Sequence, residues 1–210
     1  MRDSSCSPLI TFFLNKGMEQ YLPVQNVFTP AECQQLIAIG KSKSLRRAEM
    51  RDLKTHALIV NENVRKCHWR PYDKNEVAFA YERLADAALK AAPSFGLVIE
   101  NQFDETIKII DYQTGDHMFH WHYDHGDVPS NYMYYRTLSI SVCLQEAEEG
   151  GEIQLWDGKE IAIKQPAGTA IIFPSTLVHN VSQVIKGERI SILGFMHRPK
   201  PINLEIKAPQ

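Results

Sequence analysis

The hydrophobic pattern of this 210-residue chain changes its period near residue 97, and this change restricts the fold more than any other feature. Before that point, apolar residues recur at the spacing of helices. After it, they alternate with polar residues, and turn residues separate the alternating segments. Strands are therefore expected at 106–112, 137–144, 152–156, 169–173 and 189–196. Helices followed by many short antiparallel strands indicate an α+β protein: a β-sandwich or jelly roll with N-terminal helices on one sheet.

Two helices are expected in the first hundred residues. Thr29 suits an N-cap, Pro30 suits the first helical position, and Glu32 completes a capping box. This helix is expected to run to about residue 41. The second helix is expected at 75–92, where alanines and larger apolar residues recur at helical spacing up to a proline. Both are interpreted as elements that pack on the core.

The composition is that of a globular protein, and we expect one domain over residues 1–210. Hydrophobic residues make up 44% and the formal net charge is −2, so no nucleic-acid partner is expected. No apolar run approaches the length of a membrane-spanning helix, so no membrane partner is expected. Without a CxxC pair or a secretory signal, the cysteines are expected to be reduced thiols in the cytoplasm: Cys6, Cys33, Cys67 and Cys143. The oligomeric state is not predicted.

A dense group of histidines follows residue 115, and its most informative part is His122-Tyr123-Asp124. Residues two apart in an extended segment point to the same side, so the imidazole of His122 and the carboxylate of Asp124 converge. A third ligand is available downstream in His179. Two histidines and one carboxylate form the facial triad typical of non-haem Fe(II), which leaves positions open for substrate and dioxygen.

Two of the expected strands indicate a lined cavity. In 137–144 the aliphatic face is expected to pack on the helices, while the small polar face, which begins with Thr137 and ends with Cys143, points inward. Arg189 and Ser191 share one face of the last strand. A guanidinium that points into a barrel requires an anion to neutralise it, so these two residues predict an anionic ligand.

Taken in order, these motifs resemble those of the Fe(II)/2-oxoglutarate-dependent oxygenases, most closely the prolyl 4-hydroxylase-like branch. The matching elements are Tyr112-x-x-Gly115, His122-x-Asp124, Arg136-Thr137-Leu138-Ser139, Gly150-Gly151-Glu152, Pro166-Ala167-Gly168, Phe173-Pro174-Ser175, His179 and Gly187-x-Arg189. The resemblance implies a double-stranded β-helix, which is a jelly-roll variant, with a catalytic core at 105–198 and mainly helical support at 1–100. One departure is that His122 lies ten residues after Tyr112, one more than is common in the family.

The resemblance also implies roles for individual residues. The implied ligands are His122, Asp124 and His179 for Fe(II), and Arg189, Ser191, Tyr112 and Thr137 for 2-oxoglutarate. O2 is the second co-substrate. The catalytic set is then the metal triad with Arg189, whose planar fork suits the far carboxylate of 2-oxoglutarate. The implied activity is hydroxylation of an unactivated C–H bond, because halogenating members lack the carboxylate that Asp124 provides.

The substrate stays open between a peptidyl residue such as proline, a free amino acid and a related small molecule. An alternative class is a cupin-type metal protein, such as an isomerase, a dioxygenase that needs no oxo-acid, or a binding module. His120-x-His122 faintly resembles a cupin motif, but the glutamate ligand is missing at its expected place. A nucleic-acid demethylase of the same superfamily is disfavoured because Phe195 stands where a second arginine is expected.

Two further features each have two interpretations. Segment 126–135 mixes glycine, proline and tyrosines, so it is either a lid that contacts substrate or an ordered hairpin that covers the core. His120 also has two interpretations. Either it contacts the substrate or the metal ligands, or it is a histidine that packs in the protein or faces solvent.

Overall fold

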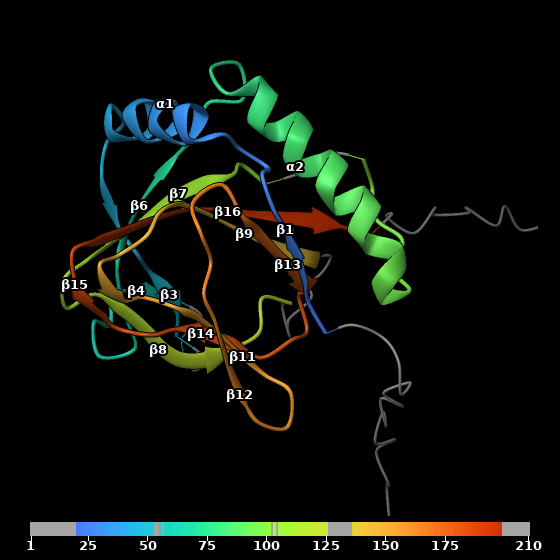
Figure 1. The fold of residues 1–210 in the computed structure, drawn as a ribbon. Coiled ribbons are helices and arrows are strands. Elements are labelled where there is room, and N and C mark those ends of the chain that lie inside the picture. Colours follow the sequence, from blue (N-terminus) through green and yellow to red (C-terminus); the bar gives the residue numbers. More distant parts are fainter. Residues whose placement is uncertain are drawn as a thin grey trace, which may run out of the picture.

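The protein, seen in a computed structural model that describes residues 20–52, 55, 57–101, 103, 105–125 and 136–198, is built on two antiparallel sheets that face each other (Figure 1). The large sheet has the order β1 (Leu22–Val24), β13 (Ala170–Pro174), β9 (Arg136–Gln145), β16 (Glu188–His197), β7 (Lys108–Gln113), β6 (His68–Pro71) and β2 (Arg46–Arg47). The small sheet has the order β12 (Glu160–Ile163), β11 (Ile153–Trp156), β14 (His179–Val181), β8 (His117–His122) and β5 (Arg65–Lys66). This double sheet confirms the predicted jelly roll.

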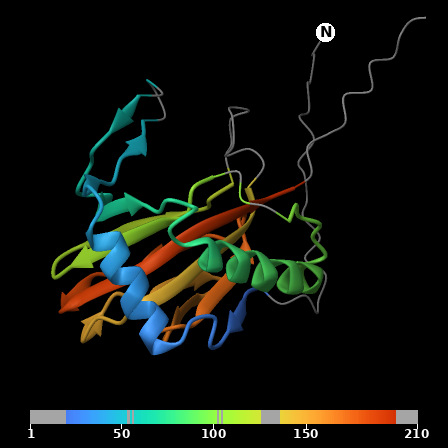
Figure 2. The ribbon, with the colours of Figure 1, turned by 90° about the horizontal axis from the view of Figure 1, so that it is seen from above.

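Two short strand pairs complete the β-structure. They are β3 (Met50–Arg51) with β4 (Leu58–Ile59), and β10 (Glu149–Gly150) with β15 (Val184–Lys186). The first pair forms an arm that extends away from the sheets in Figure 2. All five strands predicted from the alternation are present, as β7, β9, β11, β13 and β16.

Both predicted helices are present and lie on the outer face of the large sheet (Figures 1 and 2). Helix α1 (Pro30–Lys41) begins with the expected capping box: Glu32 N donates to Thr29 Oγ1 at 3.3 Å and Thr29 N donates to Glu32 Oε2 at 2.8 Å. Helix α2 (Ala78–Ala91) begins at Ala78 instead of residue 75 and continues into the short 3-10 helix η1 (Ala92–Phe95).

The largest core lies between these helices and the large sheet. The aliphatic face of β9 is fully buried there with side chains of α1 and α2: Leu138, Ile140, Val142 and Leu144 pack in one cluster with Leu36, Ile37, Ala80 and Leu84. The prediction that this face packs on the helices is confirmed. The opposite, polar face of β9 therefore faces the small sheet, which is where a ligand cavity was expected.

The first hundred residues are less helical than the expected mainly helical support. Six short strands, β1 to β6, lie between residues 22 and 71, and four of them extend the two main sheets: β1, β2, β5 and β6. They were missed because they span only two to four residues and carry several arginines and lysines, so they show no hydrophobic alternation. The extended conformation of β1, β5 and β6 follows from pairing with β13, β8 and β7, whereas β2 pairs with β6 and β3 pairs with β4.

No helix in the described part of the chain is long and apolar enough to cross a membrane. Three of the four cysteines are free thiols buried in the protein: Cys33, Cys67 and Cys143. Cys6, the segment 126–135 and the side chain of His120 lie outside the described residues, so the interpretations given to them above are not tested.

Gly168 joins the turn before β13 to the start of α1. Its φ is +82°, and its carbonyl accepts hydrogen bonds from Val27 N at 2.9 Å and Phe28 N at 3.3 Å. A Cβ at this position would lie 2.2 Å from the Phe28 carbonyl oxygen. We expect Gly168→Ala to lower the free energy of unfolding by about 2–4 kcal/mol, because left-handed strain and a backbone clash add. Denaturant unfolding measures this.

Gly158 provides the matched control, since it also has a positive φ, +69°, but a Cβ there would meet nothing within 4 Å. Gly158→Ala is expected to cost only the backbone strain, about 1 kcal/mol. Equal losses in the two variants would show that the contact with Phe28 contributes nothing.

Candidate functional site

Three side chains from two separate segments converge between the two sheets. His122 ends β8, Asp124 follows two residues later, and His179 begins β14 directly opposite His122 in the strand register. The distance is 3.7 Å from His122 Nε2 to Asp124 Oδ1, and 3.4 Å from His179 Nε2 to Asp124 Oδ2. In the described part of the chain this is the one group of three or more potential ligands within 4.8 Å of one another. Its donor set fits Fe(II).

His179 is oriented as a ligand by its own hydrogen bond. Its Nδ1 lies 2.9 Å from the carbonyl oxygen of Leu177. A carbonyl oxygen only accepts hydrogen bonds, so Nδ1 carries the proton and the Nε2 lone pair faces Asp124. The ring is buried against Phe173, with centroids 4.8 Å apart. Such an outer contact fixes both the tautomer and the ring orientation that a metal ligand requires.

Asp124 is held in place from two directions. Ser139 Oγ donates to Asp124 Oδ2 at 2.7 Å, and Ser175 Oγ lies 2.9 Å from Ser139 Oγ. The Asp124 backbone N–H donates to the Ser175 carbonyl at 2.9 Å, which ties the end of β8 to the end of β13. Burial acts to raise the pKa of Asp124, but His179, His122 and the Ser139 hydrogen bond together lower it. The carboxylate is therefore kept ionised, as metal binding requires.

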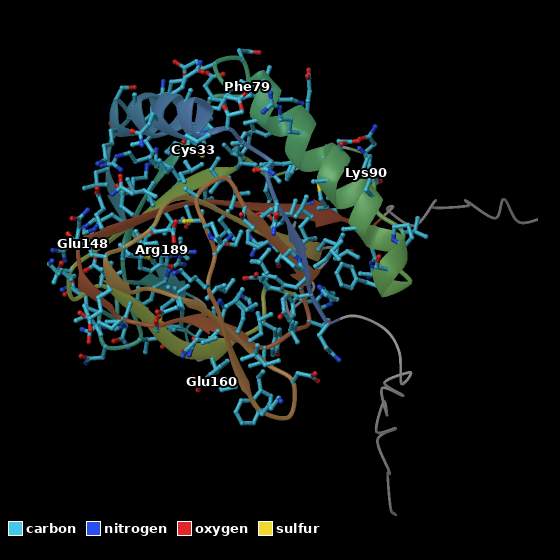
Figure 3. The ribbon with its side chains drawn as sticks, in the orientation of Figure 1. Cys33, Phe79, Lys90, Glu148, Glu160 and Arg189 are labelled. Carbon is cyan, nitrogen blue, oxygen red and sulfur yellow. The ribbon has the colours of Figure 1, made fainter. Side chains whose placement is uncertain are left out.

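Arg189 lies deeper between the same sheets, on β16 (Figure 3). Only 4% of the residue is exposed. Its Nη1 donates to Ser191 Oγ at 2.9 Å and its Nη2 donates to Gln165 Oε1 at 3.1 Å. No carboxylate of the described residues pairs with it. Because a buried guanidinium without a counter-charge is costly, the surroundings of Arg189 fit a ligand that carries a carboxylate.

Two neutral side chains complete the surroundings of Arg189. The Tyr112 ring centroid lies 5.7 Å from Arg189 Cζ, and burial, assisted by Cys67, raises the pKa of the Tyr112 phenol. Cys143 is opposite Ser191 in the register, and burial raises the pKa of its thiol to about 11. Both groups stay protonated at neutral pH. The structure thus brings together three of the four residues expected around the oxo-acid: Arg189, Ser191 and Tyr112.

Thr137, the fourth, lies elsewhere on β9. It is six residues before Cys143, so it is about 20 Å along the strand from the level of Ser191. Its carbonyl accepts a hydrogen bond from Ser175 N at 3.0 Å, which places Thr137 at the Asp124 end of the site.

Gln165 was not identified from the sequence. It is a buried residue just before Pro166, and its Nε2 donates to the carbonyls of Ser141 at 2.6 Å and Thr169 at 2.9 Å. These two bonds fix which end of the amide is the oxygen, and that oxygen accepts from Arg189. A single glutamine next to a turn gives no local signal, so only the tertiary structure identifies it as the residue that positions Arg189.

We expect Gln165→Leu to weaken binding of a carboxylate ligand by Arg189 about tenfold, because one hydrogen bond to a charged group is lost and the guanidinium is free to turn. The dissociation constant of 2-oxoglutarate, measured by calorimetry, reports this. The affinity of the triad for Mn(II) is the internal control and should not change. If 2-oxoglutarate binds the variant as tightly as the native protein, Gln165 does not position the guanidinium.

Arg136 is held in a cluster with Glu105, Phe195 and His197. Its guanidinium is paired with Glu105 and lies 3.7 Å from the centroid of the Phe195 ring. His197 Nε2 lies 3.2 Å from Glu105 Oε1. Burial acts to raise the pKa of Glu105, but its bonds to Arg136 and His197 lower it to about 2. Glu105 therefore stays ionised, and its charge is neutralised by that of Arg136.

A sequence model of the 2OG-Fe(II) oxygenase superfamily matches residues 107–197, the segment that carries all four residues of the implied catalytic set. A PKHD-type hydroxylase of Janthinobacterium sp. (strain Marseille) is 40% identical over 85 residues, which are 38% of this chain and 38% of that protein. The match thus spans little more than a third of this relative. The resemblance seen in the motifs is confirmed.

Solved structures of prolyl hydroxylases share the fold. A Pseudomonas putida prolyl-4-hydroxylase has a TM-score of 0.68 and 18% identity, over 86% of this chain and 94% of that chain. The viral collagen prolyl hydroxylase of Paramecium Bursaria Chlorella virus-1, in its 2OG complex, has a TM-score of 0.63 and 19% identity, over 86% of this chain and 97% of that chain.

Proposed function

We infer that this chain, whose residues 107–197 are a 2OG-Fe(II) oxygenase domain, is an Fe(II)- and 2-oxoglutarate-dependent dioxygenase that hydroxylates an unactivated C–H bond. The observation that carries this inference is the pairing of two features in one space: a His-Asp-His triad and, deeper, a buried arginine without a carboxylate partner among the described residues. A cupin-type metal protein, the alternative from the sequence, would have no use for the buried Arg189.

The triad residues fit Fe(II), and the Arg189 pocket fits the far carboxylate of 2-oxoglutarate. When bound, the iron and the oxo-acid supply the oxidising chemistry: 2-oxoglutarate and O2 become succinate and CO2 while one oxygen atom enters the substrate C–H bond. The protein's part is positioning. His179 presents Nε2 because Leu177 holds its Nδ1 proton, Ser139 fixes one oxygen of Asp124, and Arg189 sets the depth to which a dicarboxylate enters.

The related oxygenases act on peptides or small molecules, and we propose the same range for this chain. A peptidyl proline is supported by the names of the relatives, which include prolyl hydroxylases. A free amino acid or related small molecule is the other candidate.

We also propose that residues 1–210 form a single domain that works in the cytoplasm. The single domain is supported by the core, in which residues of α1 and α2 pack in one cluster with residues of β9, β7 and β16. The cytoplasmic location is supported by three buried thiols that form no disulfide.

The test is a screen of amino acids and proline-containing peptides with the purified, Fe(II)-loaded protein. We expect succinate to form only when 2-oxoglutarate is added, and the product to gain one oxygen atom by mass spectrometry. The Asp124→Ala variant is the control for adventitious iron. Substrate oxidation that proceeds equally well without 2-oxoglutarate would overturn the proposed function.

A further inference from the structure

Two cations outside the implied catalytic set face the space between the sheets. Arg65 on β5 pairs with position 118 of β8, which has the same parity as His122, so Arg65 shares the inner face of the small sheet with that ligand. Lys108 on β7 has the same parity as Tyr112, the residue beside Arg189, so Lys108 is on the inner face of the large sheet. Both residues are partly buried.

Neither cation has an acidic partner among the described residues. Arg65 makes one hydrogen bond, from its Nε to Cys67 Sγ at 3.4 Å. Lys108 Nζ lies over the ring of Trp69, 5.2 Å from its centroid, and makes no ion pair within the described ranges. Two carboxylates act electrostatically on Lys108, those of Glu105 and Asp124, and Asp124 acts also on Arg65. The influence of Asp124 is the smallest of those that act on either cation, and Tyr112 acts more strongly on Arg65. Arg65 thus faces the space that Tyr112 and Asp124 border.

Both carboxylates already have other partners. Glu105 is bound to Arg136 and His197, and Asp124 is the anionic member of the metal triad. Burial is the main cause that lowers the pKa of Lys108, and the nearby Arg136 and Arg65 charges lower it further. No hydrogen bond or ion pair with the described residues holds the Lys108 ammonium, which lies over the Trp69 ring. A methionine would fill the same space without the cost of burying a charge.

The charges of the loaded site do not cancel. Fe(II) and the 2-oxoglutarate dianion balance each other, Glu105 balances Arg136, and Asp124 formally balances Arg189. Arg65 and Lys108 are left as excess positive charge on the inner faces of the two sheets. A guanidinium and an ammonium in a partly dehydrated cavity are the groups that bind carboxylates and phosphates in proteins.

We propose that the primary substrate carries an oxyanion, a carboxylate or a phosphate, which Arg65 and Lys108 bind next to the metal centre. This inference rests on the proposed function, because it assigns these residues to the substrate of the same site. It adds a requirement that a neutral prolyl peptide does not meet: the group bound beside the reacting carbon is anionic. Lys108 and Arg65 are then residues that determine specificity.

Inorganic sulfate is a probe that tests this without knowledge of the substrate. Protein loaded with Mn(II) and excess radiolabelled 2-oxoglutarate is dialysed against labelled sulfate, so that the Arg189 pocket is filled and only a second anion site is measured. We expect one sulfate per chain, with affinity lowered about tenfold in Lys108→Met and in Arg65→Met, because each removes one charged hydrogen-bond donor. Lys108→Arg should retain binding. Competition by acetate and by methyl phosphate then ranks carboxylate against phosphate.

Lys90→Met is the matched control, since Lys90 is an exposed lysine on the outer side of α2, paired with Asp86 and far from Arg189 in Figure 3. It should bind sulfate as the native protein does. Equal sulfate affinity in the native protein and in Lys108→Met and Arg65→Met, all with native melting curves, would overturn the proposal. The bound 2-oxoglutarate is counted in the same cells. If 2-oxoglutarate does not bind but sulfate binding is still weakened in Lys108→Met, the proposed function fails and the anion site is retained.

Discussion

Replacing Asp124 with alanine is expected to abolish metal binding and, with it, all 2-oxoglutarate turnover. Asp124 is the anionic ligand of the triad, and it links the two histidines, since one of its oxygens faces each ring at 3.4 Å and 3.7 Å. Without it, two neutral imidazoles are left. We expect Mn(II) or Fe(II) affinity to fall by more than about 100-fold, the upper end of the loss caused by outer-sphere changes at metal sites. Calorimetric titration with Mn(II) measures this.

Ser139→Ala supplies the graded comparison. Ser139 does not contact the metal position but donates a 2.7 Å hydrogen bond to Asp124, so its loss leaves all three ligands in place while it frees the carboxylate to rotate. About 10- to 100-fold weaker metal binding is expected, the range typical of outer-sphere partners. Metal affinity is therefore predicted to decrease in the order native protein, Ser139→Ala, Asp124→Ala. A metal affinity in Asp124→Ala equal to the native value would mean that the ion is bound elsewhere, and the site would have to be abandoned.

The sequence was sufficient to predict the parts of this site that depend on local periodicity. The alternation in β9 placed Leu138 on the core side and Ser139 on the cavity side, and the structure has both there. Arg189 and Ser191 were likewise placed on one face, and they are hydrogen-bonded. In each case the period of two fixes the direction of a side chain once the strand itself is recognised.

What the sequence could not predict depends on pairing between distant segments. His179 lies opposite His122 only because β14 pairs with β8 in one register, and a shift by one residue would turn its ring to the other face. The same holds for Arg65, which reaches the cavity through a two-residue strand that shows no pattern of its own. Gln165 needs three partners from three different segments before its role is apparent.

The second large effect is expected for Arg189→Ala, which should weaken the binding of 2-oxoglutarate and leave the affinity for the metal unchanged. In Arg189→Ala the far carboxylate of the oxo-acid would enter a buried pocket that retains Ser191 and Tyr112 but has no charge to oppose it. Breaking a buried ion pair by removing one partner costs about 3–5 kcal/mol. The dissociation constant of 2-oxoglutarate should therefore rise by at least about 100-fold, because each 1.4 kcal/mol is about tenfold.

Two comparisons make this expectation specific. Arg189→Lys keeps the charge but loses the planar fork, so it should recover part of the affinity and not all of it. Arg47→Ala removes an exposed arginine that pairs with Glu62 on the surface, and it should bind 2-oxoglutarate as the native protein does. Metal affinity should be native in all three variants, since the triad does not contact Arg189. If Arg189→Ala still turned over 2-oxoglutarate with a native KM, Arg189 would not be the residue that binds its far carboxylate. The buried guanidinium would then bind a different anion, and another residue would have to position the oxo-acid.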